Sequence, residues 1–258
     1  MPFLIAIQLL TIVPIKYGRQ YSPAEMGRSL AFFPIVGLLI GLLLWGLDLL
    51  LTLFLPVMLV NVLLFAVLAI VTGALHLDGF IDTCDGLAAR GSRSEKLEAM
   101  KDSGVGAVGV VAVCFMLLAQ IASFSALPDG TRVSALIAMP LLSRWTMACA
   151  VWTFPPARRE GLGWAVRQQA SWKGILIAVI LTLGISWVVV GWWGILLVGG
   201  LTIIALALGQ YLSATFGGLS GDTYGAINEV TQLGALVFIY IISTYSGAFP
   251  GGVIPLIS

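Results

Sequence analysis

The sequence predicts an all-α, polytopic integral membrane protein, a bundle of about seven transmembrane helices forming a single domain over residues 1–258. Of the 258 residues, 59% are hydrophobic and only 10% are charged, and the mean hydropathy is +1.04. Soluble domains are about 45–50% apolar and about 25% charged. The apolar residues also gather in runs of about 20, the length that crosses a bilayer as a helix.

The apolar runs give the predicted spans in chain order. These are Ala31–Leu55, Val57–Ala74, Val105–Leu127, Val133–Phe154, Gly174–Val190, Trp192–Phe216 and Leu233–Phe249. A shorter run, Phe3–Val13, precedes them, and its length does not decide whether it crosses, re-enters or lies on the membrane surface.

The cations predict the orientation of the bundle. Of the 13 Lys and Arg residues, all but Arg132 and Arg144 lie in three segments that alternate to the same side. These segments are 14–30, 75–104 and 155–173. The positive-inside rule places this side in the cytoplasm of a multi-pass protein of the cell (inner or plasma) membrane. The formal net charge of +1 excludes the basic surface of a nucleic-acid-binding protein.

The acidic residues indicate where chemistry takes place. Six of the 12 lie between Asp78 and Asp102, interleaved with apolar residues. If residues 78–89 are helical, Asp82 and Asp85 lie about 40° and 20° from Asp78 around the axis, on one face. Such carboxylates repel one another, and a divalent cation removes the repulsion. We therefore expect Asp78, Asp82, Asp85 and Asp102 to bind Mg²⁺, which takes carboxylate and phosphate oxygens.

Basic residues suited to phosphate follow the acidic run, notably Arg90 and Lys101. Acids for a metal beside bases for phosphate favour phosphoryl transfer. The alternative is a solvated loop whose charges only set the topology. It fits best for Arg93, Glu95, Lys96 and Glu98.

The glycine-rich segment 217–232 falls on the same side, so we expect it and segment 75–104 to be the two active-site loops. Asp222 and Glu229 are seven residues apart, and a helix starting near Asp222 puts both on one face. Asp222 is equally explained as a helix N-cap. Arg144, a cation inside a predicted span, is a candidate substrate contact.

These residues resemble those of the cobalamin synthases, the membrane-bound adenosylcobinamide-GDP ribazoletransferases. The matching segments are Phe32–Gly41, Thr72–Gly86, Met100–Gly109 and Gly217–Glu229. The run H-L-D-G-x-x-D-x-x-D-G at His76–Gly86 is the most specific of them. Ser220 stands where Thr is expected, which keeps the hydroxyl group.

The resemblance implies that adenosylcobinamide-GDP and α-ribazole, or its 5′-phosphate, are joined with release of GMP and with Mg²⁺ as cofactor. The candidate catalytic residues are His76, Asp82, Asp85 and Asp222. One of the acids, or His76, takes the proton of the attacking hydroxyl. The candidate substrate-binding residues are Arg90, Lys101, Arg144, Ser220 and Glu229. Besides these small molecules, the lipid bilayer is the expected partner. The oligomeric state stays open, and a homo-oligomer is one of the alternatives.

Two other classes compete with this interpretation. Asp82–Arg90 matches D-x-x-D-G-x-x-A-R, the first half of the CDP-alcohol phosphotransferase motif, but the second half, G-x-x-x-D-x-x-x-D, does not follow. A transporter is the non-enzymatic alternative. Transporters place ionisable residues near the middle of the bilayer, whereas most acids here fall in the segments predicted to be cytoplasmic.

Overall fold

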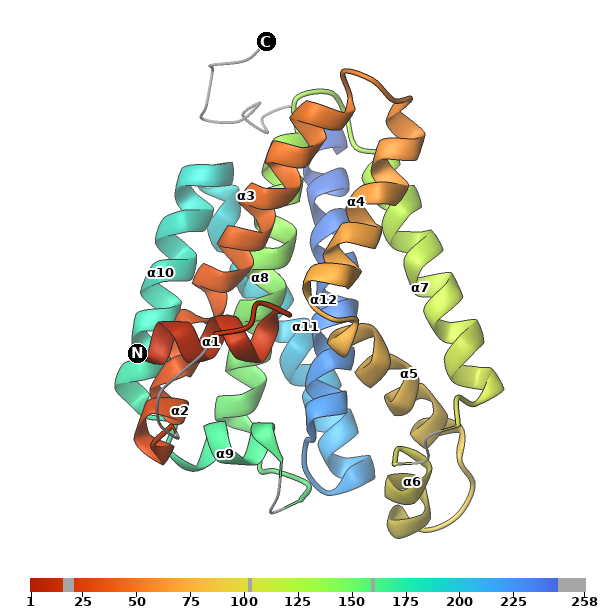
Figure 1. Cartoon of the computed structure of the whole chain (residues 1–258), viewed down its shortest axis with the longest axis vertical. Coiled ribbons are helices and arrows are strands. Elements are labelled where there is room, and N and C mark those ends of the chain that lie inside the picture. The colour runs from red at the N-terminus through yellow and green to blue at the C-terminus, as the bar shows by residue number, and fades with distance from the viewer. Residues whose placement is uncertain (16–20, 102–103, 159–160, 246–258) are drawn as a thin grey trace.

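The structure, a computed structural model, describes residues 1–15, 21–101, 104–158 and 161–245, and it is built of helices (Figure 1). In chain order they are α1 (Pro2–Leu10), α2 (Pro23–Ser29), the 3₁₀ helix η1 (Leu30–Phe32), α3 (Phe33–Leu51), α4 (Val57–Val71), α5 (Leu75–Ala88), α6 (Arg93–Ala99), α7 (Ala107–Ser125), α8 (Arg132–Thr153), α9 (Leu162–Gln168), α10 (Trp172–Val190), α11 (Trp193–Phe216) and α12 (Gly221–Tyr245).

The expected class of fold is confirmed. Within the described ranges, six helical stretches are long and apolar enough to cross a membrane, and the bent pair of α4 and α5 brings the number up to seven if it counts as one span. Most helix bounds lie within a few residues of the predicted spans. The exception is α12, which begins at Gly221 rather than near Leu233.

The core of the bundle lies along α8, where every residue from Ser134 to Val151 is buried. Helix α3 packs against α8 through Gly37 and Gly41, a G-x-x-x-G pair that allows close backbone approach. A Cβ on Gly41 would lie 2.7 Å from the Ile137 Cα. Small residues, rather than apolar bulk, therefore set the closest helix contact of the core.

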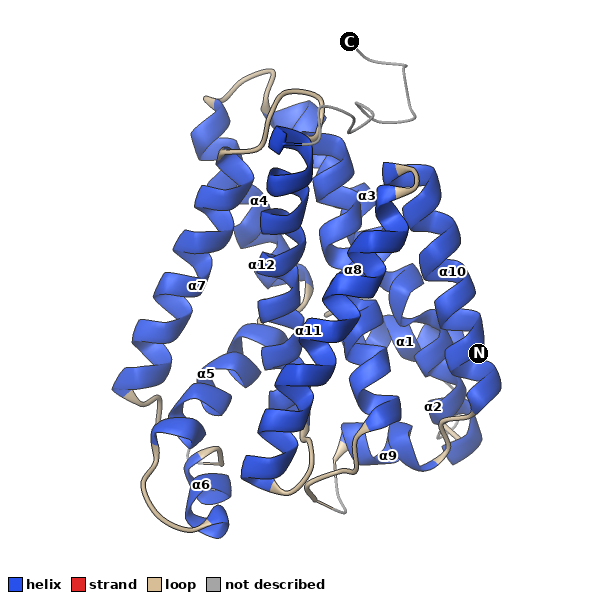
Figure 2. Ribbon diagram, turned by 180° about the vertical axis from the view of Figure 1, so that it is seen from behind, coloured by secondary structure: helices blue, strands red, loops and turns tan. Residues whose placement is uncertain are grey.

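The outer helices present apolar side chains to the surroundings. Figure 2 shows α11 in front, with α7 and α10 at the two sides. Phe115 of α7, Ile180 of α10 and Ile203 of α11 are all at least 60% exposed. Such surfaces suit a hydrocarbon environment rather than water. They agree with a bundle surrounded by lipid.

Helices α4 and α5 meet at a bend of 87°. Gly73 and Ala74 turn the chain with φ of 61° and 54°, and Ala74 is the only non-glycine residue with positive φ in the described ranges. The break frees backbone groups that a membrane interior leaves unpaired. The Ile12 N–H donates to the Val71 carbonyl at 2.8 Å and satisfies one of them.

The N-terminal apolar run forms α1, which lies across the long helices (Figure 1). Its nine residues measure about 14 Å along the helix axis, less than half the thickness of the hydrocarbon core. Ile5, Ala6 and Leu10 are buried against the bundle. Helix α1 therefore covers the bundle and does not cross the membrane by itself.

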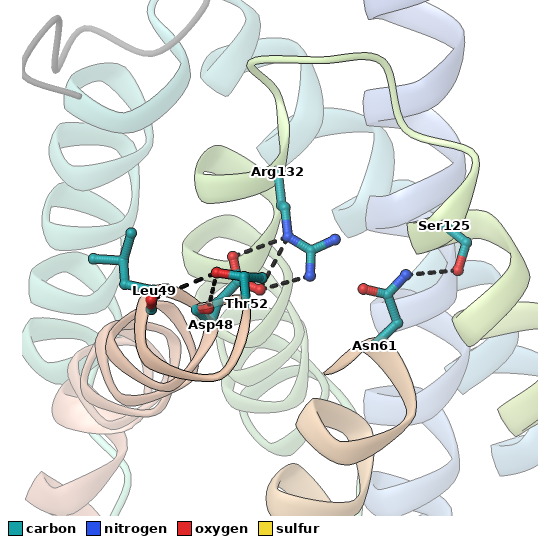
Figure 3. Close-up of polar contacts among 6 residues, drawn as sticks. All are labelled: Asp48, Leu49, Thr52, Asn61, Ser125 and Arg132. Carbon is teal, nitrogen blue, oxygen red and sulfur yellow. Dashed lines mark hydrogen bonds and ion pairs between the residues drawn. The ribbon is translucent and has the colours of Figure 1, made fainter. Parts of the chain in front are cut away.

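The two ends of the bundle differ in character. Helices α2, α6 and α9 and the α11–α12 connection share one end (Figure 1), as the alternation of cation-rich segments predicts. Lys16, Arg19 and Arg159 of these segments lie outside the described residues. At the opposite end Arg132 pairs with Asp48, with Nη2 to Oδ1 at 2.6 Å (Figure 3).

Candidate active site

Helices α5 and α12 cross closely at two glycines. A Cβ on Gly79 of α5 would lie 2.7 Å from the Asp222 carbonyl oxygen. A Cβ on Gly225 of α12 would lie 3.0 Å from the His76 carbonyl oxygen. Only glycine permits this approach without moving a backbone. The crossing brings the acidic face of α5 to the first turn of α12.

The structure brings four of the predicted acids together. Segment 75–104, expected as an active-site loop, contains the helices α5 and α6, and α5 includes most of the stretch 78–89 considered as a helix. Asp78 is exposed on α5, while Asp82 and Asp85 are half-buried. The negative charges of Asp78, Asp222 and Asp85 all act on Asp82. The shared face expected for the three aspartates of α5 therefore exists, and Asp222 joins it from α12.

Asp85 has a structural partner that the sequence does not reveal. Its Oδ2 accepts from the Gly106 N–H at 2.9 Å and its Oδ1 from the Gly109 N–H at 2.8 Å. These amides lie at the start of α7, where the first turn leaves backbone donors unsatisfied. A Cβ on Gly109 would lie 2.5 Å from Oδ2. Asp85 thus joins α5 to α7, and its role in metal binding or catalysis stays a prediction.

Asp222 lies at the start of α12 without capping it. Within segment 217–232 the helix α12 begins at Gly221, so the helix start considered near Asp222 is present. The Ser220 hydroxyl donates to Asp222 Oδ2 at 3.1 Å, and Ser220 and Thr223 exchange hydrogen bonds across the first turn. Ser220 and Thr223 do the capping, so the Asp222 carboxylate is available for other partners.

Two adjoining cavities meet at Asp222. The larger, about 430 Å³, is the more polar of the two, here called the polar cavity, and is lined by Arg158, Trp164 and Ser220 among others. The smaller, about 130 Å³, is mainly apolar, and His76 and Asp78 line it. Gly163, Gly221 and Asp222 line both. Asp78 is thus the one α5 aspartate that lines a space that a substrate can occupy, whereas Asp82 and Asp85 line neither of these two cavities.

Arg158 is a candidate that sequence reasoning counted only as a topological charge. It lines the polar cavity, and its positive charge acts on Asp222. Its Nη2 donates to the Leu97 carbonyl at 2.7 Å, which fixes the guanidinium beside the site. The two predicted phosphate-binding residues Arg90 and Lys101 are exposed and line neither cavity. The sequence signal for Arg158 was its place in a cation-rich segment, which does not distinguish it from its neighbours.

A backbone pairing shapes the wall of the polar cavity. The Ala157 N–H donates to the Leu219 carbonyl at 2.8 Å, and the Leu219 N–H donates to the Pro155 carbonyl at 2.9 Å. Gly218, with φ of 145°, permits this approach. Arg93 secures the same connection by donating from Nη2 to the Gly217 carbonyl at 3.1 Å. Arg93 is exposed, as the solvated-loop interpretation expects, and in addition it contacts the connection between α11 and α12.

Arg144 and Glu229 lie in a buried polar network between α7, α8 and α12. Glu229 Oε2 accepts from Gln120 Nε2 at 2.9 Å, and Arg144 Nη1 donates to Gln232 Oε1 at 3.1 Å. Both charged side chains are at most 4% exposed. The cavity beside them, about 10 Å³, has room for little more than one water molecule. Neither residue lines the two larger cavities, so their substrate-binding role stays a prediction.

The acidic face fits Mg²⁺ as a shared rather than a closed site. In the part of the chain that the structure describes, no group of three or more His, Cys, Asp or Glu side chains is arranged to hold a metal. Mg²⁺ is usually bound by one or two carboxylates together with waters and substrate phosphates. The crowding of like charges around Asp82 is what such an ion relieves. Asp102, the fourth predicted ligand, lies outside the described residues.

Comparison with known proteins identifies relatives along nearly the whole chain. The family described as cobalamin-5-phosphate synthase matches residues 2–240. The adenosylcobinamide-GDP ribazoletransferase of Geotalea daltonii is 37% identical over 240 residues, covering 93% of this chain and 97% of the relative. Those of Desulforamulus reducens and Pseudomonas fluorescens Pf0-1 are 33% and 34% identical, each over 92% of this chain and over 95% and 98% of the relative.

No solved structure matches the chain. The family model covers the acidic face of α5, the start of α12 and both cavities. The chain belongs to the cobalamin-5-phosphate synthase family.

Proposed function

We propose that this chain joins adenosylcobinamide-GDP to α-ribazole, or to α-ribazole 5′-phosphate, and releases GMP. The observation that carries the proposal is the meeting of Asp78 of α5 with Asp222 at the junction of the two cavities, next to Asp82, on which both charges act. The relatives that cover nearly the whole chain are named adenosylcobinamide-GDP ribazoletransferases. The activity is thus a phosphoryl-linked group transfer at a membrane-embedded site.

The reaction forms one bond and breaks one bond at the same phosphorus atom. A ribose hydroxyl oxygen of the acceptor attacks the phosphorus attached to the cobinamide arm, and the bond from that phosphorus to GMP breaks with its electron pair leaving on GMP. The hydroxyl proton passes to a side chain at the junction. His76, Asp78 and Asp222 line the apolar cavity and are the candidate acceptors.

Acidic and basic residues around the junction both help to balance the negative charge of the diphosphate. Two carboxylates among Asp78, Asp82 and Asp222 would hold Mg²⁺ together with the diphosphate, and the ion would neutralise the charge on the phosphates. Arg158, which lines the polar cavity, suits the phosphate oxygens of the donor or of the leaving GMP. Orientation by these fixed groups is the main contribution expected of the protein in phosphoryl transfer.

We also infer that the site faces the cytoplasm of the cell (inner or plasma) membrane. The support is the cation-rich end of the bundle, which carries α2, α6 and α9 (Figure 1). Positively charged connections favour the cytoplasmic side. Leu219, Ser220 and Gly221, at the connection between α11 and α12, line the polar cavity at this end.

The test is product formation by protein purified in detergent. With adenosylcobinamide-GDP, α-ribazole and Mg²⁺, we expect adenosylcobalamin and GMP in equal amounts. CDP-diacylglycerol in place of the donor should release no CMP. CMP release without GMP would indicate a CDP-alcohol phosphotransferase, and turnover of neither donor would favour a transporter.

A further inference from the structure

The smaller cavity combines apolar walls with an opening at the catalytic junction. Leu10 of α1, Phe33 of α3, Val151 of α8 and Val166 of α9 are buried residues that line it. These side chains come from four helices that are far apart in the sequence and meet beside α12. The mouth is acidic, because Asp78 and Asp222 also line the cavity.

Two polar groups in this wall have no partner among the residues that the structure describes. His76 and Tyr224 line the cavity and are 3% and 4% exposed. His76 Nε2 and the Tyr224 hydroxyl oxygen are buried and make no hydrogen bond with any described residue. Buried polar groups are nearly always hydrogen-bonded, because leaving one unpaired costs about 1–3 kcal/mol. An apolar pocket with a few polar groups that lack partners is the common design of a small-molecule site.

The size and polarity of the cavity select among the parts of the two substrates. A cavity of about 150 Å³ holds a benzene-sized molecule, so 130 Å³ excludes the corrin macrocycle. Guanine carries polar groups on most of its edges and would leave several of them unpaired here. The diphosphate would bring its negative charges against apolar walls, which is unfavourable. The base of α-ribazole, an uncharged dimethylbenzimidazole with one free ring nitrogen, has the matching chemistry, and its apolar benzene ring is the part that this volume admits.

We propose that the smaller cavity is the subsite for the benzimidazole base of the acceptor, with the Tyr224 hydroxyl donating to its free ring nitrogen. This inference rests on the proposed function and adds the location of one substrate. The apolar edge of the base packs between α1, α3, α8 and α9, and the ribose lies at the mouth. There its attacking hydroxyl faces Asp78 and Asp222, and His76 Nε2 can accept a hydrogen bond from a ribose hydroxyl. Helix α1 is thus a wall of the acceptor site.

The first test removes a single hydroxyl group. Tyr224→Phe deletes an unpartnered buried polar atom, so it should leave thermal stability unchanged or slightly raised. If the hydroxyl binds the base, KM for α-ribazole should rise by about fivefold to tenfold, the value of one hydrogen bond. KM for adenosylcobinamide-GDP should not change. The matched control is Tyr240→Phe on the same helix, which lines none of the three cavities described and should alter neither constant.

The second test fills the cavity and varies the base. Leu9→Trp, on the short helix α1, should lower the affinity for α-ribazole measured by titration calorimetry without donor, and Leu9→Met should preserve it. Wild-type protein should prefer α-ribosides of dimethylbenzimidazole over those of adenine, because adenine brings polar groups that the walls cannot pair. The affinity for α-ribazole measured by calorimetry therefore tests the subsite independently of turnover.

The outcomes separate this inference from the proposed function. No cobalamin from wild-type protein would overturn the function itself. Wild-type activity with a rise in the donor KM, rather than the acceptor KM, in Tyr224→Phe and Leu9→Trp would assign the cavity to the donor and overturn the subsite. Wild-type activity with both constants unchanged in both variants would also overturn it.

Discussion

Gly79 of α5 lies against the backbone of Asp222 of α12, so closely that a Cβ on Gly79 would come within 2.7 Å of the Asp222 carbonyl oxygen. This contact sets the distance between the two acidic elements of the site. It explains how carboxylates more than 130 positions apart in the chain come to act on one another. A helix crossing, rather than a pair of loops, therefore assembles the candidate active site.

Replacing this glycine should separate the two helices. Gly79→Ala adds a Cβ that has no room, so α5 or α12 must shift and the carboxylates move apart. We expect turnover to fall by at least about tenfold, because small displacements at an active site carry large rate costs. The matched control is Gly46→Ala on α3, where a Cβ meets nothing within 4 Å. Equal turnover in the two variants would contradict the role of the crossing.

Turnover should depend more on a charge at the centre of the acidic face than on a charge outside it. Asp82→Asn keeps the side-chain size but removes the charge that Asp78, Asp85 and Asp222 surround, and it should lower turnover by about 100-fold or more while the protein stays folded. Glu95→Gln is the control. Glu95 is exposed and caps α6, and hydrogen bonds from Ser92 lower its pKa. Glutamine also serves in this capping position, so turnover should stay within about twofold. Equal losses in both variants would contradict the acidic-face assignment.

Asp85 should contribute to stability as well as to charge. Asp85→Ala removes both acceptors of the Gly106 and Gly109 amides at the start of α7. Loss of such caps costs about 0.5–2 kcal/mol, so thermal unfolding in detergent should occur at a lower temperature. Asp82→Asn should unfold close to wild type. A wild-type unfolding temperature for Asp85→Ala would show that these hydrogen bonds do not hold the helix.

The orientation can be measured by cysteine labelling in intact cells. In a variant whose three native cysteines are replaced by alanine, Glu98→Cys on α6 and Asp129→Cys on the connection before α8 place exposed thiols at opposite ends of the bundle. An impermeant maleimide should label Cys at 129 from outside, and Cys at 98 only after permeabilisation. The reverse pattern would invert the inferred topology.

The spans were predictable because a membrane helix needs little more than length and apolar composition. Helix α12 is the informative exception. Its first half carries polar residues such as Asn228, Glu229 and Gln232, which in sequence resemble a loop. In the structure they are buried against other helices, where Gln120 and Arg144 pair with them. Periodicity cannot reveal such partners, since they come from α7 and α8.

The candidate active site was also predictable in part, because residue spacing shows which side chains share a helical face. The spacing of Asp78, Asp82 and Asp85 predicts a shared helical face, and that face exists. The 87° bend before it depends on an alanine in the left-handed region, for which the sequence gives no signal. Tyr224 and Arg158 have no motif of their own and become candidates only when α12 and α9 meet around the cavities.

The central claim, that the α5 carboxylates act on a donor diphosphate through a shared metal, is tested most directly by a Mg²⁺ titration of GMP release. Wild-type protein with adenosylcobinamide-GDP and α-ribazole should depend on Mg²⁺, and the apparent affinities for metal and donor should each improve when the other is raised, because each supplies ligands to the other. Asp82→Asn should weaken both affinities together. GMP release that proceeds equally well without Mg²⁺, or an Asp82→Asn variant with unchanged metal dependence, would contradict the account.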